Sequence, residues 1–73
     1  MRNLSKVNLS VISVVRNEEA FVGEMIKSLV SSSPTFVNLE LIIVDDGSTD
    51  KTINEIQKVR PLLPKLRILK NTN

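Results

Sequence analysis

The chain has 73 residues, of which 41% are hydrophobic and 25% charged, and its formal net charge is +2. This length allows one small domain at most, and no apolar run approaches the ~18 residues that a membrane-spanning helix needs. Because the chain has no cysteine and no histidine, disulfides, thiol nucleophiles, imidazole bases and zinc sites of the usual kind are excluded. Residues 51–73 hold six Lys/Arg against one Asp/Glu, but two phenylalanines are too few for base stacking, so we expect no nucleic-acid binding.

Two apolar segments with different periodicities occupy the first half of the chain. Leu9 to Val15 is almost wholly apolar, which is typical of a strand buried on both faces of a parallel sheet. We predict an amphipathic helix from Glu18 to Ser31, ended by Pro34. Asn17 is expected to cap it, since an amide oxygen there can accept from the first free backbone N–H groups. The apolar stripe of this helix comprises Phe21, Val22, Met25, Ile26, Leu29 and Val30.

The second half repeats this pattern. Leu39 to Val44 predicts a second buried strand, and Ser48 or Thr49 is expected to cap a second helix that runs to about Val59. Leu66 to Leu69 predicts a third short strand. The inward residues of the second helix are expected to be Ile53, Ile56 and Val59. The order β-α-β-α-β predicts an α/β fold with a parallel sheet and right-handed crossovers.

Polar residues follow the first two predicted strands directly. Ligands of parallel sheets bind beyond the carboxyl ends of the strands, so residues 15–17 should lie beside residues 45–47. Asp45 and Asp46 should point to different sides, because strand side chains alternate. An EF-hand loop is excluded because Lys51 stands where its glycine is required. A glycine-rich phosphate loop would need more glycines than Gly23 and Gly47.

Two interpretations of this acidic turn stay open on the residues alone. A carboxylate at a strand end can accept hydrogen bonds from the ring N–H of a base and from ribose hydroxyls, which would make a nucleoside pocket. Alternatively, Asp46 or Asp50 caps the following helix and Gly47 only turns the chain.

The segments LSVISVVRNEEAFVGEMIKSLV and LELIIVDDGSTDKT together resemble the opening of family 2 glycosyltransferases, and the resemblance extends from about Leu9 to Asn71. It implies a Rossmann-like nucleotide-diphospho-sugar transferase fold, of which residues 1–73 are an incomplete, amino-terminal nucleotide-binding part. It further implies inverting transfer of a sugar from a nucleotide-diphosphate donor to an acceptor, in cell-wall or polysaccharide biosynthesis. The enzyme would be cytoplasmic or at the cytoplasmic face of a membrane.

The resemblance also implies roles for single residues. Val14 to Asn17 would lie along the base, Asp46 would accept its ring N–H with Asp45 nearby, and Glu18 would lie at the rim. The implied nucleotide-binding set is Val14, Val15, Arg16, Asn17, Glu18, Asp45, Asp46 and Gly47. Many relatives have proline at the place of Val14 and tyrosine at that of Arg16, so any stacking on the base must come from the guanidinium.

The family's divalent metal, Mg²⁺ or Mn²⁺, is held by an Asp-x-Asp motif that lies later in its sequences, and its catalytic base lies later still. We therefore expect no catalytic residue and no metal ligand in this chain, since no residue separates Asp45 from Asp46.

Other classes fit less well. A phosphorelay receiver domain begins with its acid-ended strand, whereas a full β-α unit precedes that strand here. Haloacid-type phosphatases are excluded because Val44 occupies the position of their nucleophile. A non-catalytic nucleotide-binding relative stays open.

Overall fold

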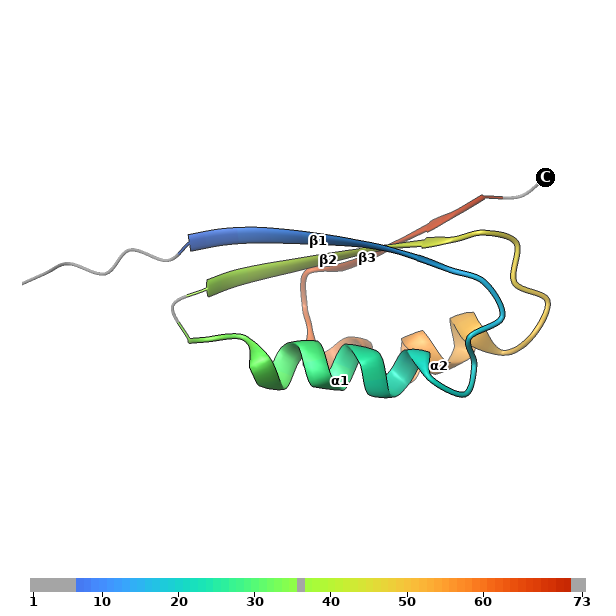
Figure 1. Ribbon diagram of the computed structural model, residues 1–73, viewed down its shortest axis with the longest axis horizontal. Coiled ribbons are helices and arrows are strands. Elements are labelled where there is room, and N and C mark those ends of the chain that lie inside the picture. The colour runs from blue at the N-terminus through green and yellow to red at the C-terminus, as the bar shows by residue number, and fades with distance from the viewer. Residues whose placement is uncertain (1–6, 36, 72–73) are drawn as a thin grey trace, which may run out of the picture.

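The computed structural model describes residues 7–35 and 37–71. Its elements are β1 (Val7–Val15), α1 (Val22–Ser32), β2 (Val37–Asp45), α2 (Thr52–Val59), a short 3-10 helix (Arg60–Leu62) and β3 (Leu66–Lys70). The strands form one parallel sheet in the order β1-β2-β3 (Figure 1). The predicted β-α-β-α-β order is confirmed, and each strand is slightly longer than the sequence suggested.

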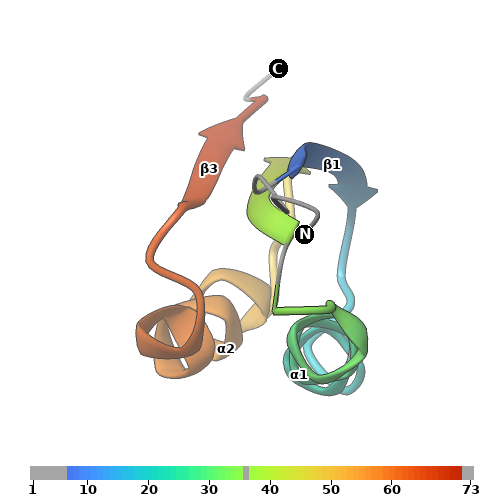
Figure 2. The ribbon, with the colours of Figure 1, turned by 90° about the vertical axis from the view of Figure 1, so that its left-hand side faces the viewer.

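The molecule has two layers, with both helices on the same face of the sheet (Figure 2). The hydrophobic core lies between these layers, and the central strand β2 contributes most to it. Leu41, Ile43, Ile26 and Ile56 are completely shielded from solvent. The buried apolar residues are Val15, Val22, Ile26, Leu39, Leu41, Ile43, Ile56, Val59, Leu63 and Leu66. Thr52 is the one uncharged polar side chain buried among the described residues.

The prediction that the first strand is buried on both faces is wrong. Ile12 and Val14 are 68% and 67% exposed, because no described element covers the sheet face opposite the helices. An apolar run indicates what a strand could bury, and burial also needs a partner on each face. This uncovered surface, called the open face below, is a second apolar surface of the sheet.

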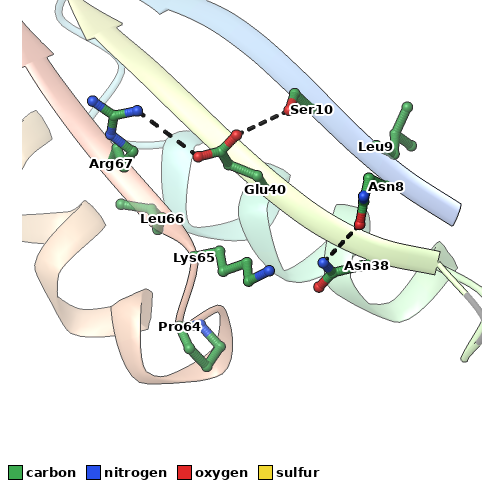
Figure 3. Close-up of a pocket in the computed structure, with 9 residues that line it drawn as sticks. All are labelled: Asn8, Leu9, Ser10, Asn38, Glu40, Pro64, Lys65, Leu66 and Arg67. Carbon is green, nitrogen blue, oxygen red and sulfur yellow. Dashed lines mark hydrogen bonds and ion pairs between the residues drawn. The ribbon is translucent and has the colours of Figure 1, made fainter. Parts of the chain in front are cut away.

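The open face changes character along the strands. At their amino ends, Ser10 donates a hydrogen bond of 2.9 Å to Glu40, and Arg67 lies 3.9 Å from the same carboxylate. Asn38 donates to Asn8 at 2.9 Å. These cross-strand pairs line a shallow hollow of about 450 Å³ (Figure 3). The polar residues thus occupy one end of this face and the exposed apolar residues Ile12 and Val14 the other.

The predicted start of the first helix is wrong by four residues. Helix α1 begins at Val22 rather than Glu18, and Phe21 at its N-cap makes no side-chain capping bond. Asn17 does not cap the helix: it adopts the left-handed conformation, with φ +50°, and its side chain bonds elsewhere. The helix ends at Ser32, before Pro34, as expected, and the Ser33 hydroxyl donates to the Leu29 carbonyl at 2.9 Å.

The second helix also begins later than predicted. Helix α2 starts at Thr52 after the N-cap residue Lys51, and neither Ser48 nor Thr49 caps it. Asp50 supplies a side-chain acceptor at this helix start instead, because its carboxylate accepts the Thr52 amide at 2.9 Å. In both corrections, the residues that sequence reasoning assigned to caps form bonds between the two loops instead.

Candidate functional site

Two loops meet at the carboxyl ends of β1 and β2. The first loop is residues 16–21 and the second is residues 46–51, and Figure 1 shows both at the same end of the sheet. Val15 pairs with Asp45 in the strand register, and the Asp46 amide donates to the Val15 carbonyl at 2.9 Å. The expected neighbourhood of residues 15–17 and 45–47 is thereby confirmed.

Asn17 is the centre of the contact between these loops. Its side-chain oxygen accepts a hydrogen bond from the Thr49 backbone amide at 2.8 Å, and its backbone amide donates one to the Ser48 hydroxyl at 2.9 Å. A left-handed residue other than glycine is unfavourable, although asparagine tolerates this conformation better than most. The two bonds hold Asn17 in that conformation.

Asp45 is committed to the second loop. Its side chain is buried, with 5% of the residue exposed, and it accepts hydrogen bonds from both the hydroxyl and the amide of Ser48. Ser48 in turn accepts from the Asn17 amide. Asp45 therefore fixes the serine that fixes the first loop, and both of its carboxylate oxygens accept hydrogen bonds from that serine.

Asp46 differs from Asp45 in having no bond to the loops. Its side chain is half-buried. One of its two carboxylate oxygens accepts a hydrogen bond of 3.0 Å from the side-chain amide of Asn71. It does not cap α2. Of the two adjacent aspartates, Asp46 is the one with an oxygen that accepts no hydrogen bond from a described residue.

Gly47 follows with φ +72°. A Cβ built there would lie 3.7 Å from the Asn71 carbonyl oxygen, an ordinary contact. The glycine is thus required by its left-handed backbone and not by lack of space.

Val14, Val15 and Glu18 line a hollow of about 230 Å³ beside the first loop, together with Ser13, Phe21, Val22 and Met25. Phe21 is 69% exposed, so the hollow has an apolar rim. Arg16 is exposed, and no hydrogen bond or ion pair to another described residue involves its guanidinium. Val14, Val15 and Glu18 share this hollow. Asp45 ends β2, and Asp46 and Gly47 lie on the second loop.

Sequence reasoning missed two residues that hold the first loop. Thr52 is fully buried, and its hydroxyl accepts the Glu18 amide at 2.9 Å. Asp50 accepts the Glu19 amide at 3.3 Å. Hydrogen bonds from the Thr52 hydroxyl and amide, opposed by desolvation, hold the pKa of Asp50 below its ordinary 3.8. Threonine and aspartate at a helix start are common caps, so nothing local in the sequence indicated partners more than 30 residues away.

Among the described residues, no group of three or more His, Cys, Asp or Glu side chains lies together so that it could hold a metal ion. Asp45 and Asp50 already accept hydrogen bonds within the loops. The larger hollow of about 450 Å³ involves Asn8, Asn38 and Glu40, at the opposite ends of the strands.

Within residues 7–35 and 37–71, no helix is long and apolar enough to cross a membrane.

The family model for glycosyl transferase family 2 matches residues 10–73. The chain belongs to this family. An uncharacterized glycosyltransferase of Haemophilus influenzae is 35% identical over 63 residues, covering 86% of this chain and 19% of that protein. The poly(ribitol-phosphate) beta-N-acetylglucosaminyltransferase TarS of Staphylococcus aureus is 33% identical over 54 residues, covering 74% and 9%.

A crystal structure of residues 1–349 of Staphylococcus aureus TarS in complex with UDP has the same fold over this region. Its TM-score is 0.77 at 31% identity, and the match covers 92% of this chain and 19% of that one. The Rossmann-like α/β architecture of a family 2 glycosyltransferase is thereby confirmed, and the receiver-domain alternative is not favoured. The chain spans about a fifth or less of the length of these family members.

Proposed function

We propose that this chain is the amino-terminal, nucleoside-binding part of a glycosyltransferase that transfers a sugar from a nucleotide-diphosphate donor to an acceptor. UDP is the nucleotide we propose, since a crystal structure of TarS, which shares this fold at 31% identity, contains UDP. The acceptor hydroxyl would displace UDP from the sugar with inversion. Residues 1–73 would bind the base and ribose of the donor.

The observation that best supports this proposal is that the two adjacent aspartates differ in their hydrogen bonds. Asp45 accepts hydrogen bonds from Ser48, whereas Asp46 keeps an oxygen without a partner among the described residues. The second oxygen of Asp46 can therefore accept a hydrogen bond from a ligand, which Asp45 is less able to do. Asp46 is therefore the proposed acceptor for the ring N–H of the base.

The other proposed nucleotide-binding residues follow from their positions. Val14 to Asn17 would lie along the base, with the exposed guanidinium of Arg16 free to stack on its face. Glu18 would lie at the rim, where it lines the hollow with Val14 and Val15. Gly47, with its left-handed backbone, would let the second loop approach the ligand closely. Asp45 would act through Ser48 rather than by touching the nucleotide.

The proposal assigns these residues donor binding alone. The divalent metal and the catalytic base that the family implies would lie in later parts of the enzyme, where the Asp-x-Asp motif of the family lies; the described residues hold no group of three or more possible metal ligands. We further propose that the enzyme acts in cell-wall or polysaccharide synthesis, in the cytoplasm or at the cytoplasmic face of a membrane.

The test is a calorimetric titration of UDP onto the full-length enzyme, wild type against Asp46→Asn. The variant keeps the shape of the side chain and weakens a charge-assisted hydrogen bond of roughly 1.5–3 kcal/mol. We expect UDP affinity to fall ~10–100-fold, with a thermal melt close to that of the wild type. Glu24→Gln, which removes one exposed charge from α1, should bind UDP normally. Unchanged affinity in Asp46→Asn would return the acidic turn to a structural role.

A further inference from the structure

Three successive backbone amides of the first loop donate to side chains of the second loop and of Thr52, the first residue of α2. The Asn17 amide donates to Ser48, the Glu18 amide to Thr52 at 2.9 Å, and the Glu19 amide to Asp50 at 3.3 Å. None of these bonds belongs to a helix cap or to the sheet ladder. The first loop is thus held by side chains that lie 31 to 34 residues further along the chain.

Thr52 and Asp50 act as one unit in this arrangement. The Thr52 hydroxyl accepts the Glu18 amide and donates its own proton to Oδ1 of Asp50. Asp50 Oδ1 also accepts the Thr52 amide, which leaves Oδ2 for the Glu19 amide. The carboxylate therefore orients the hydroxyl, and together they fix two neighbouring peptide groups of the first loop.

These two peptide groups follow Asn17 directly, and Asn17 is held in the left-handed conformation. Such a residue returns to a commoner conformation unless its surroundings determine it. Without the bonds to the Glu18 and Glu19 amides, the chain after Asn17 would be held less firmly. Arg16 and Asn17, which follow the paired end of β1 and are proposed to lie along the base, would then depend on the bonds that Asn17 makes to the second loop.

We infer that Asp50 and Thr52 are positioning residues for nucleotide binding, which hold the first loop in the conformation that accepts the base. The inference rests on the proposed function. Neither side chain needs to touch the nucleotide: Thr52 is fully buried, and both oxygens of Asp50 already accept backbone amides. Their contribution is preorganisation, which saves the ligand the cost of ordering the loop.

The test measures UDP affinity by calorimetry on the full-length enzyme with Thr52→Val, which keeps the shape of the side chain and removes the hydroxyl. We expect the Kd for UDP to rise about 3- to 10-fold, the effect of losing one buried hydrogen bond. Thr52→Ser keeps the hydroxyl and should restore the Kd to within about twofold of the wild type. Titrations are made far below the melting temperature of every variant, so that all are folded.

Ser33→Ala is the matched control for loss of stability. It removes a hydroxyl bond at the other end of α1, to the Leu29 carbonyl, and should lower the melting temperature without changing the Kd. If Thr52→Val does not fold, Asp50→Asn replaces it, because this side chain is only partly buried. It is expected to raise the Kd in the same direction, since one acceptor oxygen is lost.

The outcomes separate this inference from the proposed function. If Asp46→Asn weakens UDP binding while a folded Thr52→Val or Asp50→Asn binds as the wild type does, the positioning role is wrong and the nucleotide site stands. If Ser33→Ala weakens binding as much as Thr52→Val, the effect is one of stability and the inference is also overturned. If the wild type does not bind UDP, or Asp46→Asn binds UDP unchanged, the proposed function fails and this inference fails with it.

Discussion

The backbone amide of Thr49 donates a hydrogen bond of 2.8 Å to the side-chain oxygen of Asn17, across 32 residues of sequence. This bond joins the two loops that follow β1 and β2. It also explains why Asn17 does not cap α1, because its side-chain oxygen already accepts the Thr49 amide.

The two glycines of the chain should respond oppositely to alanine. Gly47→Ala forces a side chain onto a backbone with φ +72°, and we expect a loss of about 1–2 kcal/mol of unfolding free energy. Gly23→Ala lies in α1, where the new Cβ would meet Val59 at an ordinary 3.9 Å. It should stabilise the chain by up to about 1 kcal/mol. Urea unfolding measures both, and equal effects would contradict the left-handed assignment at Gly47.

Substitutions at Asn17 should separate its backbone from its side chain. Asn17→Gly tolerates φ +50° but loses the acceptor for the Thr49 amide, which should cost ~1 kcal/mol. Asn17→Ala loses the acceptor and also strains the backbone, so we expect a total loss of ~2–3 kcal/mol. Asn17→Asp keeps an acceptor and should be the mildest change. An alanine variant as stable as the glycine variant would show that no strain exists here.

Stability should depend on the ionisation of Asp50. Its pKa is lowered from 3.8, chiefly by the hydrogen bond from the Thr52 hydroxyl. A lowered native pKa means that the stabilisation is complete above the ordinary pKa and is lost as pH falls through the native one. Wild type should therefore exceed Asp50→Asn in stability at neutral pH, and the difference should shrink below about pH 4.

Melts of both proteins across this pH range test that expectation. Every other ionisable side chain is common to the two proteins, so the difference between their melts isolates Asp50. A stability difference that stays constant from neutral to strongly acidic pH would exclude an ionised Asp50 from the contact between the loops.

The open face should drive self-association of the isolated chain. Ile12 and Val14 are both about two-thirds exposed on β1, and exposed apolar patches of this kind favour association. Sedimentation over a range of concentrations should show oligomers of residues 1–73. Ile12→Lys with Val14→Lys should reduce them, whereas Asn8→Lys, at the polar end of the same face, should not. A monomer at all concentrations would contradict this account of the face.

The sequence predicted the fold well because its signals are local. The apolar runs ending at Val15 and Val44 and the helical stripe through Val22 and Ile26 each indicate one element without reference to the rest. The helix starts were wrong for the opposite reason. Asn17 and Ser48 are good capping residues in isolation, and only the fold shows that each of them forms hydrogen bonds with the other loop.

The candidate site was predictable in position and less so in detail. The order of strands placed residues 15–17 beside residues 45–47, as the structure has them. It could not distinguish the bonded Asp45 from the freer Asp46, or reveal the buried Thr52, because these depend on hydrogen bonds between distant segments. The assignment of residues 14–18 and 45–47 to nucleotide binding stays a prediction.

The most direct test of the central claim is a crystal structure of the full-length enzyme with UDP bound. The account predicts that the uracil lies against residues 14–17 and donates its ring N–H to the Asp46 carboxylate within about 3.2 Å. Asp45 should still bond to Ser48, and Asn17 should keep its left-handed conformation. A uracil bound elsewhere, or one lying in this site without a hydrogen bond to Asp46, would contradict the account.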